Sequence, residues 1–181
     1  MIRAFLLASL AWAVGLTVTI VLGMLLGVLV PGPAATLGGP LALGLAMGFA
    51  HERVLGQAAV TRAFVPLTAL GATLGWLLGS LVAWRLFVSG HEAIAPWVNG
   101  PLLGLVVGAA QSLALRGACA AQRPAWTAGS ALAWTAAIGP VLAPATPVSL
   151  RIAALAVPGL HAAMVVLLRQ RTARALGLPT T

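Results

Sequence analysis

Long apolar runs and short polar segments alternate along the chain. Six of the apolar runs approach the length of about 20 residues that a helix needs to cross the hydrocarbon core of a bilayer. They cover residues 4–30, 39–51, 63–84, 98–115, 124–142 and 148–168. Segments rich in proline, glycine, arginine or other polar residues separate the runs, and such segments typically end or connect helices. The pattern therefore predicts an all-α integral membrane protein with six transmembrane helices in a single domain, 1–181.

The composition favours lipid, rather than water, as the surroundings of most side chains. Hydrophobic residues make up 61% of the chain and charged residues only 7%, whereas soluble domains carry about 25% charged residues. The basic residues are all arginine, the acidic ones are Glu52 and Glu92, and the net charge is +8. A nucleic-acid-binding protein needs basic residues clustered on a solvated domain, and the pattern predicts no such domain. We therefore expect the lipid bilayer as a partner and no nucleic acid.

The arginines predict the orientation. With the N-terminus inside the cell, Arg85 and Arg151 fall on the outer side. The cytoplasmic segments then carry Arg3, Arg53, Arg62, Arg116, Arg123, Arg169, Arg171 and Arg174. Basic residues in short loops collect on the cytoplasmic side of membrane proteins, so both termini are predicted to be cytoplasmic. The arginine- and alanine-rich, lysine-free composition suggests a bacterium and hence a multi-pass protein of the plasma (inner) membrane.

An internal repeat divides the chain into units of about 60 residues. Segment 39–51 resembles segment 100–111, because each begins with Gly-Pro and continues with a Gly-x-x-x-Gly pair. A polar residue follows three positions after each pair, His51 in the first segment and Gln111 in the second. We interpret the chain as three pseudo-repeated helical hairpins, related in parallel, which cover about 1–60, 61–120 and 121–181.

Small residues at every fourth position predict close contacts between helices. Lipid tails are as apolar as leucine, so membrane helices associate through close packing, and glycine lets their backbones approach. The glycines in such positions are Gly23, Gly27, Gly44, Gly48, Gly71, Gly75, Gly79, Gly104 and Gly108. Two uses stay open: packing within the chain, or a face that docks another membrane subunit or a second copy.

One motif resembles a group of known sequences. It runs Gly104-x-x-x-Gly108-x-x-Gln111-x-x-x-Leu115-Arg116, and a preceding helix carries Gly-x-x-x-Gly-Trp at 71–76. This arrangement is similar to uncharacterised bacterial multi-pass membrane proteins built from repeated hairpins, over about the middle two-thirds of the chain. The resemblance implies a helical membrane fold and no established activity. In the first repeat, histidine replaces the glutamine of the motif.

Polar side chains at membrane depth are costly and therefore mark candidate sites. Gln111, Ser112 and His161 are candidate binding residues that would line a polar path, although each could instead bond or pack between helices. His161 could also bind a haem iron or a pigment magnesium. A second ligand at similar depth is missing, because the predicted topology places His51 at the cytoplasmic edge and His91 in an outer loop, both solvated. The sequence therefore predicts no metal and no cofactor.

The sequence predicts no catalytic residues. Aspartate is absent, no glutamate lies within a predicted span, and neither a His-Glu-x-x-His motif nor a phosphate-binding loop occurs. We therefore predict a non-enzymatic membrane protein that acts as an accessory subunit or a homo-oligomer. The alternative is a small-solute transporter or a membrane substrate-binding component, since repeats with a site at their interface are typical of transporters. A more distant alternative is a pigment- or haem-binding membrane protein.

Overall fold

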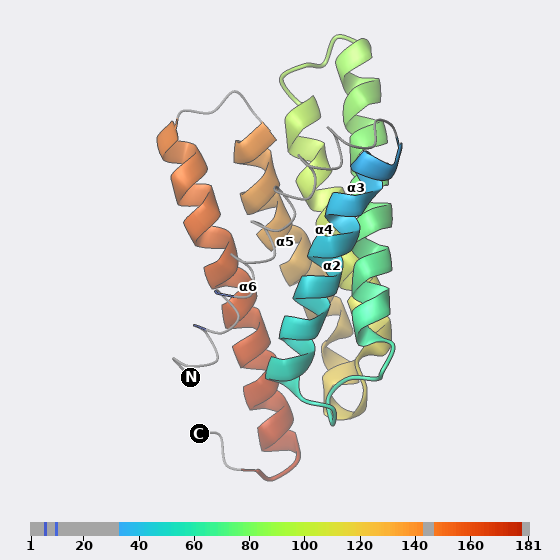
Figure 1. Cartoon of the computed structure of the whole chain (residues 1–181). Helices are drawn as coiled ribbons and strands as arrows, with labels where there is room; N and C mark the ends of the chain where they lie inside the picture. The colour runs from blue at the N-terminus through green and yellow to red at the C-terminus, as the bar shows by residue number, and fades with distance from the viewer. Residues whose placement is uncertain (1–5, 7–9, 11–32, 143–146, 179–181) are drawn as a thin grey trace.

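The computed structural model describes residues 33–142 and 147–178, together with the single residues 6 and 10. Within them, every named element is a helix. The elements are α2 (Pro33–Leu55), α3 (Phe64–Val88), α4 (Ala95–Ala114), the short 3-10 helix η1 (Gly117–Gln122), α5 (Arg123–Leu142) and α6 (Pro147–Ala175). The five α-helices lie side by side and alternate in direction (Figure 1). The predicted all-α class is therefore confirmed for the described residues.

The prediction of six transmembrane helices is wrong. Among the described residues, two helical segments are long and apolar enough to cross a membrane, Phe64–Val88 and Trp97–Ala114. The prediction counted glycine, alanine, threonine and proline as apolar, but these residues add far less hydropathy than leucine or valine, and they are abundant in α2 and α5. The prediction that both termini are cytoplasmic assumed six spans that cross the membrane in alternating directions, so it is no longer supported. The predicted span 4–30 lies outside the described residues, together with Gly23 and Gly27.

Glycines on α2 and α4 bring these helices into backbone contact with their neighbours. A Cβ atom on Gly44 would lie 2.5 Å from Ala69 Cα of α3, and one on Gly104 would lie 2.6 Å from Ala131 Cα of α5. Real Cβ atoms do not approach a backbone atom this closely, so a side chain at either position would separate the helices. Gly48 and Gly108 make similar contacts one turn further along, with Val65 and Thr127 respectively.

Helix α3 uses its own glycines against α4. Cβ atoms on Gly71, Gly75 and Gly79 would lie 3.0–3.1 Å from the Cα atoms of Val107, Leu103 and Asn99. The spacing of four residues places these glycines in a row on one face of α3. The described glycine motifs thus face other helices of the same chain. Whether the chain is also built from three repeats stays a prediction.

Two loops pair at one end of the bundle. Thr61 N–H donates to Ala114 O over 2.9 Å, and Arg116 N–H donates to Ala59 O over 3.0 Å. The two loops therefore join the end of α2 to the end of α4. Next to them lies a buried apolar core made of Leu55, Ala59, Val60, Phe64, Ala114, Leu115, Cys119, Trp126, Val165 and Leu168. A second core, further along the bundle, contains Leu43, Met47, Ala72, Leu103, Val107, Trp134 and Ala137.

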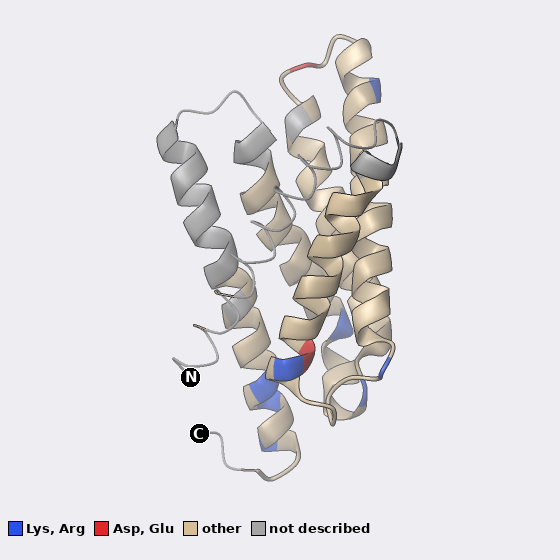
Figure 2. Cartoon of the chain, in the orientation of Figure 1, with Lys and Arg blue, Asp and Glu red and all other residues tan. Residues whose placement is uncertain are grey.

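The outer surface of the bundle is apolar along its length and basic at one end. Leu70, Leu81, Leu113 and Leu132 are between 52% and 71% exposed. Arginines gather at the end where α2, α4 and α6 finish, as the blue segments in Figure 2 show. Large exposed apolar surfaces mark contact with a membrane or a partner. Together with the two apolar helices, they favour membrane association.

The glycine contacts predict a position-specific loss of stability. Replacing Gly108 by leucine should lower the free energy of unfolding in detergent micelles by about 1–3 kcal/mol, the usual cost of overpacking, because the new side chain meets Thr127 and Ser130. The matched control is Ala109→Leu, the next residue along α4, which is exposed and should tolerate the larger side chain. Equal effects of the two substitutions would contradict the packing described here.

Candidate functional site

A buried polar cluster lies where the five α-helices meet. We define it by its residues, one from each of α2 to α6 in order: His51, Thr68, Gln111, Trp126 and His161. None of these side chains is more than 4% exposed. Burial removes water as a hydrogen-bonding partner, so such groups must satisfy one another. The cluster is therefore a junction that specifies how the helices sit together.

The glycine motifs explain why two of these residues point inward. His51 follows Gly48 by three positions on α2, and Gln111 follows Gly108 by three positions on α4. Residues spaced by three or four share a helix face, so the polar side chain continues the face that packs against the neighbouring helix. The same local pattern thus places one polar side chain from α2 and one from α4 in the cluster.

Gln111 is the centre of the hydrogen bonding. Its Oε1 accepts a hydrogen bond from Trp126 Nε1 over 3.0 Å, and its Nε2 donates to Thr68 Oγ1 over 3.2 Å. Nε2 also lies 3.5 Å from His51 Nδ1. This ring nitrogen accepts a hydrogen bond when the imidazole proton is on the other ring nitrogen. Thr68 Oγ1 in turn donates to Phe64 O on its own helix over 2.7 Å. One amide group therefore links three other helices.

The two buried histidines stack on each other. The ring centroids of His51 and His161 are 4.5 Å apart, and the ring planes differ by 14°. The indole ring of Trp126 stands roughly perpendicular to both imidazole rings, at centroid distances of 6.0 Å and 6.2 Å. Parallel stacking and edge-to-face contacts are the favourable arrangements of aromatic rings. The stacked rings join α2 to α6, which are far apart in the sequence.

This arrangement corrects the prediction for His51. The predicted topology placed it in solvent at a membrane edge, whereas it is buried on α2 against His161. The internal repeat could have indicated the burial of His51, because His51 stands 60 residues before Gln111 at the same place in the motif. The stacked pair nevertheless differs from two haem ligands on opposite sides of one iron, because each imidazole binds a metal through a nitrogen in the plane of its own ring and these planes are stacked side by side. Among the described residues, no three potential metal ligands of the His, Cys, Asp or Glu type form a group.

The three residues predicted to line a polar path have different positions. Gln111 and His161 belong to the cluster, on α4 and α6. Ser112 does not, because its Oγ donates to Ala109 O on its own helix over 2.7 Å. The hydroxyl of Ser112 therefore forms its hydrogen bond within α4. Gln111 and His161 are both buried, and whether they line a path stays a prediction.

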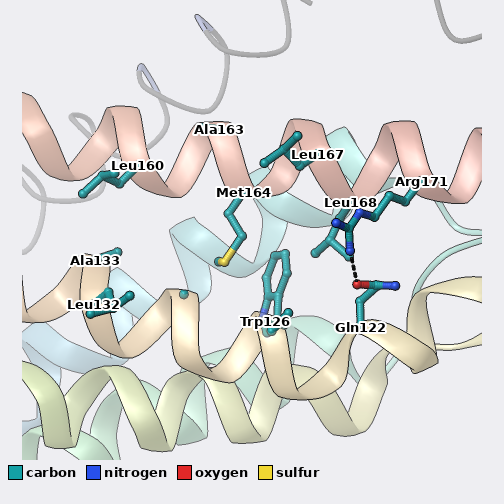
Figure 3. A pocket seen from close by; sticks show the side chains of 12 residues that line it. Gln122, Trp126, Leu132, Ala133, Leu160, Ala163, Met164, Leu167, Leu168 and Arg171 are labelled. Carbon is teal, nitrogen blue, oxygen red and sulfur yellow. Dashed lines mark hydrogen bonds between the residues drawn. The ribbon is translucent and has the colours of Figure 1, made fainter.

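A pocket of about 360 Å³ lies beside the cluster, between α5 and α6. We call it the α5–α6 groove. Figure 3 shows Leu132 and Leu160 at one end, Trp126 in the wall, and Arg171 with Gln122 at the other end. Arg171 Nη1 donates to Gln122 Oε1 over 2.6 Å. The residues that line the α5–α6 groove are Gln122, Ala125, Trp126, Gly129, Leu132, Ala133, Leu160, Ala163, Met164, Leu167, Leu168 and Arg171.

Trp126 belongs to both the cluster and the groove. Its indole N–H is bound to Gln111, and its ring forms part of the groove wall. The sequence pattern does not reveal the groove, because most of its lining residues are leucines and alanines whose spacing resembles that of a packed helix face. The residue that could have indicated the groove is Gly129 of α5, which faces Met164 of α6. The groove therefore depends on tertiary structure more than on a motif.

The lining of the groove is largely apolar. Two of its lining residues, Gln122 and Arg171, carry polar side chains apart from the indole N–H, and the rest are apolar. Ligand pockets in proteins are typically apolar with a few polar groups that set the orientation of the ligand. Comparison of the chain with family models, with curated proteins and with solved structures found no match. The resemblance to repeated-hairpin membrane proteins consequently stays a prediction.

Gln111→Leu tests the cluster. The substitution removes the partner of Trp126 Nε1 and Thr68 Oγ1, and an unsatisfied buried group costs about 1–3 kcal/mol. We expect the free energy of unfolding in micelles to fall by this amount. The neighbouring substitution Ser112→Ala breaks a hydrogen bond within one helix only and should change stability much less. Should both variants unfold like the wild type, the cluster does not hold the helices together.

Proposed function

We propose that the chain is a non-enzymatic binding protein of the bacterial plasma membrane, whose α5–α6 groove receives the apolar part of an amphipathic ligand. The observation that supports this most directly is the groove itself. It is long and apolar, it opens to the outside between two helices, and an arginine stands at one end of it. This is the membrane substrate-binding alternative from the sequence, now attached to particular residues.

The membrane location is supported by the surface of the bundle. Exposed leucines cover α3, and Trp84 and Trp97, at the end opposite the gathered arginines, are 61% and 45% exposed. Tryptophan prefers the boundary between lipid and water. The arginines gather at one end, and we propose that this end faces the cytoplasm of a bacterium, as the preference of basic residues for the inner side implies.

Binding by the groove is favoured over an accessory role based on the glycine faces. Gly44, Gly71 and Gly104 pack against helices of the same chain at distances that leave no space for a side chain. A face that is already covered cannot dock another protein. The described glycines therefore support internal packing, and they add no argument for a partner subunit or a second copy.

The cluster prepares the groove for its ligand. Trp126 is held by Gln111 and by the two histidine rings, so the wall that it forms has a defined orientation before a ligand enters. A preformed pocket saves the entropy of ordering its side chains on binding. Met164 lies in the same wall, and its unbranched thioether adapts to ligands of different shape. The groove thus combines a rigid side with an adaptable one.

Binding without turnover follows from the lining residues. Acid–base catalysis needs a group that accepts or donates a proton near neutral pH, and covalent catalysis needs an activated nucleophile. The groove lining contains neither a carboxylate, a histidine, a cysteine nor a hydroxyl group. His161 and His51 lie behind Trp126 in the cluster. We therefore propose that a ligand is held in the groove and released unchanged.

A variant that fills the groove should lose binding. Ala163 lies in the groove lining, and Ala163→Trp should occupy it, whereas Ala128→Trp places the same side chain at an exposed position outside the lining. Purified protein in dilute detergent would be labelled with a photoreactive diazirine fatty acid, and the adducts located by mass spectrometry. We expect labelling of α5 and α6 peptides in the wild type and in Ala128→Trp, with a loss of about tenfold or more in Ala163→Trp, since each 1.4 kcal/mol of lost binding is tenfold.

The distribution of the label is the second readout. If the adducts spread evenly over the exposed leucines of α3 and are unaffected by Ala163→Trp, then the groove is an ordinary part of the apolar surface and the proposed function is wrong.

A further inference from the structure

We propose that the ligand of the α5–α6 groove is an anionic phospholipid, with one acyl chain in the groove and its phosphate at Arg171. This inference rests on the proposed function and adds the chemical class of the ligand. Three features of the described residues support it: the length of the groove, the donors at its polar end, and the charge of that end of the bundle.

The length of the groove matches one leaflet. On α5 its lining extends from Ala125 to Ala133, on α6 it extends from Leu160 to Arg171, and Gln122 at the end of η1 completes the polar end. At a rise of 1.5 Å per residue, the stretch on α6 measures about 16 Å and the stretch on α5 about 12 Å. The hydrocarbon core of a bilayer is about 30 Å thick, so one leaflet contributes about 15 Å. A single acyl chain lying along the groove therefore reaches from its apolar end to its polar end at the depth of the headgroups.

The polar end presents donors for a phosphate. A guanidinium has five N–H groups, and Arg171 uses one of them on Gln122 Oε1. Because Gln122 accepts through its oxygen, its amide nitrogen can donate to the same ligand. The planar guanidinium matches the oxygens of a phosphate with two parallel hydrogen bonds. Figure 3 shows the two side chains meeting where the groove ends.

The charge of this end selects a negative headgroup. Arg169 and Arg174 lie on α6 within one turn of Arg171, and Arg123 begins α5 on the opposite side of the groove. Glu52 is the acidic residue at the same end, on α2. A zwitterionic lipid would bring its own cation toward this surplus of positive charge. A phospholipid with net negative charge brings no such cation, and basic residues near a membrane surface attract anionic lipids.

Native mass spectrometry tests the ligand class. The full-length protein would be released from micelles with equal amounts of phosphatidylglycerol and phosphatidylethanolamine of the same acyl chains. We expect bound phosphatidylglycerol to exceed bound phosphatidylethanolamine by about tenfold, the effect of one lost charge-assisted contact. In Arg171→Gln the preference should fall below about twofold while total lipid binding persists, and Arg171→Lys should restore part of it.

The matched control is Arg174→Gln, which removes the same charge from the same helix outside the groove lining. Because Arg174 contributes only to the general charge of this end, its loss should lower the preference much less than Arg171→Gln does. An equal loss in Arg174→Gln and Arg171→Gln would overturn the proposal, because the preference would then come from general electrostatic attraction. An unchanged preference in Arg171→Gln also overturns it, but leaves the groove as a chain-binding site if Ala163→Trp still abolishes binding. Lipid adducts that Ala163→Trp does not reduce would remove both the inference and the proposed function.

Discussion

The hydrogen bonds of one amide group hold the architecture together. Gln111 accepts from Trp126 and donates to Thr68, and it stands beside the stacked pair of His51 and His161. In a membrane, where burying apolar side chains against one another gains little, polar contacts and close packing would determine the arrangement of the helices. A buried amide with unmet donors or acceptors would be costly. The cluster therefore admits one register of the five α-helices and disfavours alternatives.

Glycine makes this junction geometrically possible. The side chains of the cluster can meet only if their helices approach closely, and Gly48 and Gly108 allow that approach one turn away from His51 and Gln111. The contacts of α2 with α3 resemble those of α4 with α5, since each pairs two glycines with small residues. Larger leucines consequently point outward, where they are exposed. The placement of glycines at the helix contacts thus accounts both for the close packing inside the bundle and for the apolar surface outside it.

Sequence reasoning found the parts of this structure that local spacing encodes. The helical class, the glycine positions and two of the cluster residues, Gln111 and His161, could be read from the pattern. The span count failed because alanine and glycine were counted as fully apolar. His51 was misplaced because Glu52 and Arg53 follow it, and a charged neighbour usually signals solvent. The α5–α6 groove depends on how far two helices stand apart, which no local pattern reports.

Trp126 explains why the groove and the cluster belong to one site. An indole on the surface of a helix would normally turn about its side-chain torsions and close a nearby apolar gap. Here its N–H donates to Gln111 and its ring contacts two imidazoles, so these contacts oppose a rotation of the ring into the space between α5 and α6. The polar junction that orders the bundle therefore also keeps the groove open. The stability of the bundle and the shape of the groove then depend on the same side chain, and the buried histidines influence the groove only through it.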